Sequence, residues 1–166
     1  MSADPRRHPI VYALAGGLVA GAFDITYACG FWALKAGVPP QRIFQSVAAG
    51  LLGREAARAG GFGTAALGLA LHFLIAITMS IVYYLASRGM DVLRRRPVAC
   101  GAAYGLLLYG VMNYVVVPLS KAAGGSKDPL WIGLSILVHM FLIGVPIALA
   151  ASSASRSVEG GRGGAA

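Results

Sequence analysis

Four long runs of apolar residues, separated by polar or Gly-rich stretches, dominate the pattern along the chain. Each run is close to the ~20 apolar residues that an α-helix needs to cross the hydrocarbon core of a bilayer. We therefore predict an all-α, polytopic membrane protein with transmembrane helices at about residues 10–34, 64–86, 98–119 and 130–151. The flanking pieces are a short N-terminal segment over residues 1–9 and a small, polar, Gly-rich tail over 152–166, which is expected to be disordered.

Composition supports the membrane class. Of the 166 residues, 57% are apolar and only 12% are charged, and the mean hydropathy is +0.71. A soluble domain needs more charge than this to cover its surface. The net charge of +8 includes the cluster Arg94-Arg95-Arg96 directly before the third run. By the positive-inside rule this cluster predicts that both termini are cytoplasmic. Topology thus accounts for the basic charge, and nucleic acid is not expected as a partner.

The first loop on the predicted outer side, PPQRIFQSVAAGLLGREAARAGGFG, has a pattern of its own. Ile43, Val47 and Leu51 recur every four residues, which gives a helix one apolar face. Pro40 suits the start of such a helix. We predict an amphipathic helix over about 40–58 that lies on the outer leaflet or caps the bundle.

The two halves of the chain resemble each other. The stretch RRHPIVYALAGGL at the first run aligns with RRRPVACGAAYGL at the third under an offset of 88 residues, and His72 aligns with His139 under an offset of 67. This predicts two pseudo-repeated hairpins related by an axis along the membrane normal, as in parallel-repeat transporters. Chance similarity between simple apolar segments is the alternative. Small-xxx-small spacing, typical of close helix packing, occurs twice, at Gly17 with Gly21 and at Gly101 with Gly105.

Each predicted span carries one conspicuous polar residue: Asp24, His72, Asn113 and His139. The helical rise of ~1.5 Å per residue places all four at a similar depth, in the outer half of the bilayer. A carboxylate facing lipid costs several kcal/mol. We therefore expect the four side chains to converge inside the bundle as a binding site.

Several interpretations of this cluster stay open. It suits a hydrogen-bonded network that fixes helix register, or a proton- or solute-coupled path in a pore or transporter component, because His titrates near neutral pH. A b-type haem with His72 and His139 as axial ligands is a further alternative, with glycines on the first and third spans making room for the ring. Asp24 with both histidines resembles a metal ligand set but has no motif spacing, so no metal is assigned.

The class of protein stays open too. No nucleophile elbow, phosphate loop, CxxC or HExxH motif occurs in the sequence, so no catalytic residue is assigned and an enzyme is not the expected class. A non-catalytic structural subunit of a membrane complex is the alternative to a transporter component. The expected partners are the lipid bilayer, a second copy of the chain, or such a complex.

Three stretches resemble the YagU-like small bacterial inner-membrane proteins. They are the end of the first span, GFWALKAGVPPQR, and the two His-bearing segments LALHFLIA and ILVHMFLIG. The resemblance extends over most of residues 10–150. It implies an inner-membrane location and an association with acid tolerance, and it assigns no role to any residue.

Overall fold

The computed structural model describes residues 9–122 and 124–163, with the backbone alone over 155–163, and this part of the chain is all-helical. Most of the predicted N-terminal segment therefore lies outside the described residues. The elements are α1 (Pro9–Ala36), α2 (Pro40–Leu52), α3 (Arg54–Ala59), α4 (Gly61–Gly89), α5 (Asp91–Arg95), α6 (Pro97–Val111), η1 (Met112–Val116), α7 (Val117–Leu119), α8 (Pro129–Val138), η2 (His139–Gly144) and α9 (Val145–Gly163). Here η1 and η2 are π-helical segments.

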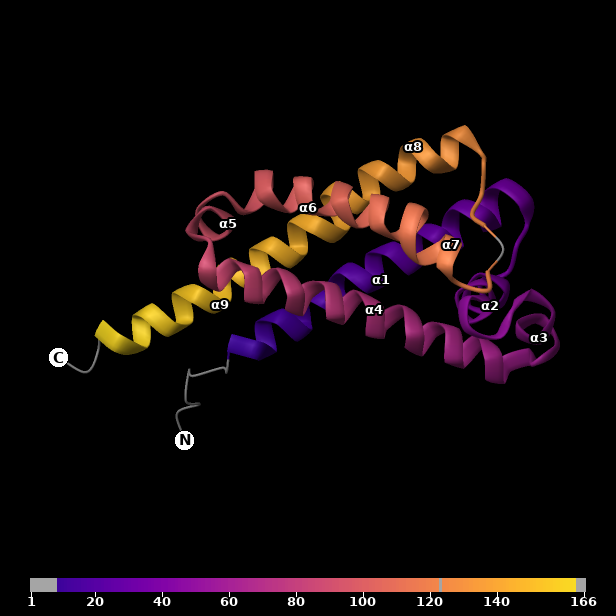
Figure 1. Ribbon diagram of the computed structural model, residues 1–166, viewed down its shortest axis with the longest axis horizontal. Coiled ribbons are helices and arrows are strands. Elements are labelled where there is room, and N and C mark those ends of the chain that lie inside the picture. The colour runs from indigo at the N-terminus through magenta and orange to yellow at the C-terminus, as the bar shows by residue number, and fades with distance from the viewer. Residues whose placement is uncertain (1–8, 123, 164–166) are drawn as a thin grey trace.

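Four helical stretches are long and apolar enough to cross a membrane: Pro9–Ala36, Gly61–Gly89, Pro97–Leu119 and Pro129–Ala154. This confirms the predicted all-α class with four candidate spans. The described parts of the chain begin and end at one end of the bundle, which we call the terminal end (Figure 1). Helices α2 and α3 and the connection from α7 to α8 lie at the opposite end, which we call the loop end.

Local sequence explains where the helices begin and end. Pro40, Pro97 and Pro129 each occupy the first position of a helix, where the missing N–H would have no intrahelical partner. Helix α1 stops at Gly37, whose φ of 62° is in the left-handed region that glycine adopts without steric cost. These signals lie close to the predicted span boundaries.

The fourth span is the centre of the bundle, because it contacts each of the other three. Its inward face is fully buried at Ile147, Ala148 and Ala151, and two of these three side chains are the small methyl group of alanine. Such a face lets neighbouring helices come close where lipid provides no hydrophobic drive for association.

The contact between α6 and the fourth span is backbone against backbone. A Cβ added at Gly105 would lie 1.9 Å from the carbonyl oxygen of His139, and one added at Gly144 would lie 2.0 Å from that of Gly101. On α1, a Cβ at Gly17 would lie 2.6 Å from the Cα of Ile77. These glycines leave no space between the helices that cross at them.

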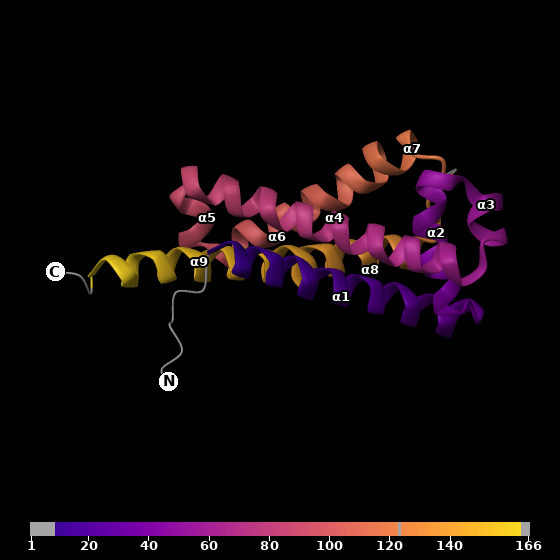
Figure 2. The same ribbon diagram turned by 90° about the horizontal axis from the view of Figure 1, so that it is seen from below.

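The second and third spans meet at the terminal end and separate toward the loop end. Tyr104 of α6 donates a hydrogen bond of 2.9 Å to the carbonyl oxygen of Met79 on α4. Beyond this point the helix that runs from α6 to α7 rises away from α1 and α8 (Figure 2).

Two prolines fall in the apolar spans, and each follows a π-helical segment. Segment η1 ends at Val116, two residues before Pro118, and η2 ends at Gly144, two residues before Pro146. Proline removes one backbone hydrogen bond and crowds the preceding turn. A π-helical turn is wider than an α-helical one, so a π segment before each proline relieves this crowding.

The loop helix differs from its prediction in two ways. It is broken into α2 and α3 at Gly53, whose φ of 86° interrupts the helix. Its buried residues are Gln45, Ala48 and Ala49, not the stripe of larger apolar residues. Helix α2 crosses α4 at a very short distance, because a Cβ added at Gly68 would lie 1.9 Å from the carbonyl oxygen of Phe44.

The C-terminal stretch also differs from its prediction. The tail was expected to be disordered from residue 152, but α9 continues as a helix to Gly163. Ser152 and Ala154 are buried, and Ser152 Oγ donates a hydrogen bond of 3.1 Å to the carbonyl oxygen of Arg94. Packing against α5 therefore continues past the apolar run. Residues 164–166 of the predicted tail lie outside the described residues.

Candidate functional site

A large open cavity of about 1120 Å³ lies at the loop end. One wall is α4, through Leu71 and Ile75, and the facing wall is η1 and α7, through Met112, Asn113 and Val117. The cavity occupies the space that opens where the second and third spans separate. Ile75 lies roughly 20 Å along α4 from its first residue at ~1.5 Å per residue, so the cavity extends deep between the spans.

Helices α2 and α3 form the outer wall of this cavity. The apolar stripe of α2, Ile43, Val47 and Leu51, lines it. These residues were predicted to face the outer leaflet or the bundle, and in the structure they face the cavity because α2 is seated on α4 through its small side, around Ala48 and Ala49.

Gln45 anchors α2 in this position. Its side chain is only 2% exposed, and its Nε2 donates hydrogen bonds to the carbonyl oxygen of Gly61 at 2.9 Å and to Thr64 Oγ1 at 3.4 Å. Arg42 Nη1 donates to Gln45 Oε1 at 3.1 Å. A buried amide with its hydrogen bonds made is costly to displace, so the outer wall is held firmly.

The two histidines predicted as site residues each make contacts with backbone and aromatic groups. His72 is partly buried, and its Nε2 lies 2.9 Å from the carbonyl oxygen of Gly21 on α1. The Nδ1 of His139 lies 2.8 Å from the carbonyl oxygen of Ser135, one turn earlier on its own helix. The ring of His139 also meets the ring of Tyr109 edge-on at 5.4 Å between centroids.

The other two predicted residues are placed differently from each other. Asn113 lines the cavity, and its Nδ2 donates a hydrogen bond of 2.9 Å to the carbonyl oxygen of Tyr109. Asp24 is partly buried on α1 and forms no hydrogen bond or ion pair with any residue that the structure describes. Among the described residues, no hydrogen bond or ion pair joins any two of the four predicted site residues.

The residues present do not fit a bis-histidine haem. The space beside the glycines that were expected to make room for the ring is occupied, because Gly17 and Gly105 lie directly against neighbouring backbone. Nε2 of His72, the atom that would ligate iron, faces a carbonyl oxygen. Within residues 9–122 and 124–163, no group of three or more His, Cys, Asp or Glu side chains is placed to hold a metal ion.

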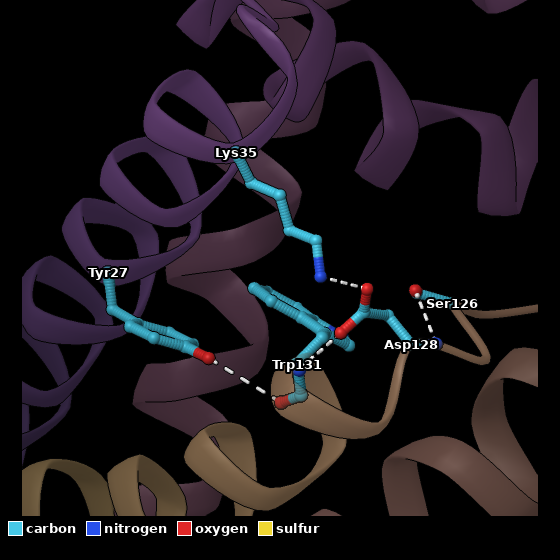
Figure 3. Close-up of polar contacts among 5 residues, drawn as sticks. All are labelled: Tyr27, Lys35, Ser126, Asp128 and Trp131. Carbon is cyan, nitrogen blue, oxygen red and sulfur yellow. Dashed lines mark hydrogen bonds and ion pairs between the residues drawn. The ribbon is translucent and has the colours of Figure 1, made fainter.

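A cluster that we call the clamp joins α1 to α8 at the loop end; it comprises Tyr27, Phe31, Lys35, Asp128 and Trp131. Trp131 stacks on Tyr27 with 5.1 Å between ring centroids and meets Phe31 at 5.1 Å. Lys35 forms an ion pair with Asp128 (Figure 3). Asp128 also caps α8 by accepting a hydrogen bond of 3.0 Å from the backbone N–H of Trp131.

The electrostatics of the clamp favour the charged form of Asp128. The hydrogen bond from Lys35, supported by that from the Trp131 N–H, lowers the pKa of the Asp128 carboxyl below its ordinary value. The clamp therefore holds the first and fourth spans together through charge as well as aromatic stacking.

Sequence reasoning missed the residues that shape this end of the molecule. Arg42, Arg54 and Arg58 line the cavity, and Lys35 pairs with Asp128 in the clamp. The signal for the arginines was three basic residues in one loop with a single acidic residue, Glu55, between them. Comparisons with family models, curated proteins and solved structures gave no match, so the geometry alone supports the functional argument.

Proposed function

We propose that this chain is a small multi-pass membrane protein that takes a solute into the loop-end cavity, as the binding component of a transport path. The observation that carries this proposal is the cavity of about 1120 Å³ between the second and third spans. Pockets for small ligands are concave, mostly apolar and lined by a few polar groups, and this cavity has those properties.

The position of Asn113 supports the proposal. It lies in η1, and π-helical turns within helices are frequent at functional sites. Its Nδ2 is satisfied by Tyr109, which leaves the side-chain oxygen as an acceptor facing the cavity region beside Gly125. Of the four predicted site residues, Asn113 is the one that lines the cavity, so the proposed path runs past Asn113 and not through a four-residue cluster.

A duplicated origin is part of the proposal. His72 meets Gly21, and His139 meets Tyr109. Under the two sequence offsets of 88 and 67, these are equivalent pairs, since 21 + 88 = 109 and 72 + 67 = 139. Each His-bearing helix thus meets its partner at a corresponding position, as expected for two hairpins of common origin.

The proposed orientation places the termini in the cytoplasm and the cavity on the outer side of a bacterial inner membrane. Arg88 and Arg94-Arg95-Arg96 gather at the terminal end, next to the spans, where the positive-inside rule weighs them most. The resemblance to YagU-like proteins, and assembly with a second copy or a membrane complex, remain proposals of the same kind.

Cysteine accessibility tests the proposal. In a Cys29→Ala, Cys100→Ala background, we compare Ile75→Cys, which lines the cavity, with Leu74→Cys, which is 60% exposed on the outer surface of the same helix. A charged, membrane-impermeant thiol reagent added from the loop side should label position 75 and leave position 74 unlabelled in its lipid environment. Equal protection of both positions would overturn the proposal, because it would mean that water does not enter the cavity.

A further inference from the structure

The charge at the mouth of the cavity is strongly one-sided. Arg42, Arg54 and Arg58 line it, and no Asp or Glu does so within the part of the chain that the structure describes. Arg54 reaches across the opening, with Nε donating to the carbonyl oxygen of Ala122 at 2.9 Å and Nη2 to that of Gly124 at 3.3 Å. The side of the cavity formed by α2 and α3 therefore carries three guanidinium groups.

Two of these guanidinium groups are available to a ligand. The bond that Arg42 makes is to the neutral amide of Gln45. Arg58 forms no hydrogen bond or ion pair with any residue that the structure describes. Guanidinium binds phosphate and carboxylate through paired N–H groups, which gives geometric specificity as well as affinity. The mouth is thus suited to an anionic group.

The deeper part of the cavity has the opposite character. Leu71 and Ile75 on α4 face Met112 and Val116, and the apolar stripe of α2 adds a third apolar surface. A free, fully hydrated anion would leave these surfaces uncovered, whereas a hydrocarbon chain would cover them at a gain of ~25 cal/mol per Å².

We propose that the cavity binds an anionic amphiphile, with a phosphate or carboxylate head group at Arg42 and Arg58 and a hydrocarbon chain between the second and third spans. The volume of about 1120 Å³ is at the upper end of small-ligand pockets, which suits a single long chain. This inference rests on the proposed function, because it needs an open cavity, and it adds the chemical class of the ligand.

The protein contains its own reporter of occupancy. The chain has two tryptophans, and both Trp32 and Trp131 line the cavity. A brominated hydrocarbon chain that enters the cavity quenches their fluorescence. We reconstitute the full chain in nanodiscs of unbrominated phosphatidylcholine and titrate dibromostearate, dibromostearoyl lysophosphatidate and the uncharged dibromostearoyl glycerol; inorganic phosphate alone is added as a competitor.

Both anionic chains should quench saturably, with half-saturation at a concentration about tenfold or more below that of the uncharged chain, as expected for one charge-assisted contact. The two head groups distinguish the two possible kinds of ligand. Tighter binding of dibromostearate points to a fatty acid, and tighter binding of the lysophosphatidate points to a phospholipid. Inorganic phosphate should not compete at matched concentrations. Equal quenching by the uncharged chain, or equal competition by phosphate, would overturn the proposal.

Variants locate the head-group site. Arg58→Gln removes a guanidinium that forms no hydrogen bond or ion pair with the described residues, and should raise the half-saturation concentration severalfold. Arg42→Gln with Arg58→Gln should raise it by about tenfold or more. The matched control, Arg88→Gln, changes an arginine in the last turn of α4 at the terminal end and should have no effect. An unchanged titration in the double variant would overturn the proposal.

The two proposals can fail separately. If position 75 is labelled from the loop side but anionic and uncharged chains quench alike, the cavity is open and the amphiphile inference alone is wrong. If position 75 is protected in protein freed of bound amphiphile, both proposals fail.

Discussion

From the middle of the bundle to its terminal end the helices touch backbone to backbone through Gly101, Gly105 and Gly144, whereas at the loop end the second and third spans separate around a cavity of about 1120 Å³. The first region is held by small residues that let helices approach. The loop end has one such contact, Gly68 against Phe44, and is otherwise held by specific polar and aromatic contacts, above all those of Gln45 and the clamp.

The difference indicates how a chain this apolar keeps a cavity open. Close glycine contacts set the crossing of the helices from the middle of the bundle to one end, and the opening at the other end follows from the tilt of the third span. Helices α2 and α3 then cover part of that opening instead of filling it, because α2 seats on α4 through its small side. Substitutions that disturb the glycine contacts of the four spans should therefore differ in effect from substitutions that disturb the contacts at the loop end.

The largest effect is expected from Gly105→Ala. The added Cβ would lie 1.9 Å from the carbonyl oxygen of His139, so two packed backbones must move apart. Such overpacking typically costs about 1–3 kcal/mol. The control Gly110→Ala, on the same helix with open space around it, should be neutral or stabilise by up to about 1 kcal/mol through helix propensity. Thermal unfolding followed by circular dichroism in detergent measures both, and equal melting temperatures would contradict backbone contact at Gly105.

A smaller and more local effect is expected from Gly68→Ala. Its Cβ would meet the carbonyl oxygen of Phe44 at 1.9 Å, which should lift α2 from α4 while the four spans stay packed. Hydrogen exchange should then rise across α2, around Gln45, with little change in α6 or α9. Gly63→Ala, on α4 with open space around it, is the control. An increase in exchange spread evenly over all the spans would show that α2 does not move independently.

The smallest effect, and the one most dependent on pH, is expected at the clamp. The pKa of Asp128 is lowered in the folded protein, so the unfolded chain binds a proton first as the pH falls. The stability contributed by the charged pair is therefore fully present above the unfolded pKa of about 3.9 and is lost as the pH falls through the lower folded value. Asp128→Asn keeps an N-cap residue and removes the charge.

Melting temperatures of the wild type and Asp128→Asn measure this effect. They should differ at pH 7 and differ less at about pH 3, below the unfolded pKa. Lys35→Gln should reduce the difference in the same way, since the two side chains form one pair. A difference that is the same at both pH values would mean that the pair does not contribute through its charge.

The sequence predicts those features of the fold that depend on residues close together in the chain. The four spans follow from the length of the apolar runs, and the starts at Pro97 and Pro129 and the stop at Gly37 follow from residues within one turn of each boundary. That the four polar residues form one site stays a prediction. Placing one polar residue on each span suggested a single cluster, yet His72 and His139 each bond to a backbone carbonyl and only Asn113 lines the cavity.

Length and composition of the apolar runs by themselves determined that this chain has four helices long and apolar enough to cross a membrane, because a helix in lipid satisfies its own backbone and needs only enough apolar residues to cross. Which glycine meets which backbone, which side of α2 is buried, and that Lys35 pairs with Asp128 were decided only by the tertiary structure. Those contacts join residues on different helices, and they depend on crossing angles and rotations that no local pattern specifies. The cavity exists for the same reason: it is the space left between the second and third spans, whose closest glycine contacts are with other helices, α4 with Gly17 of α1 and Gly105 of α6 with the fourth span.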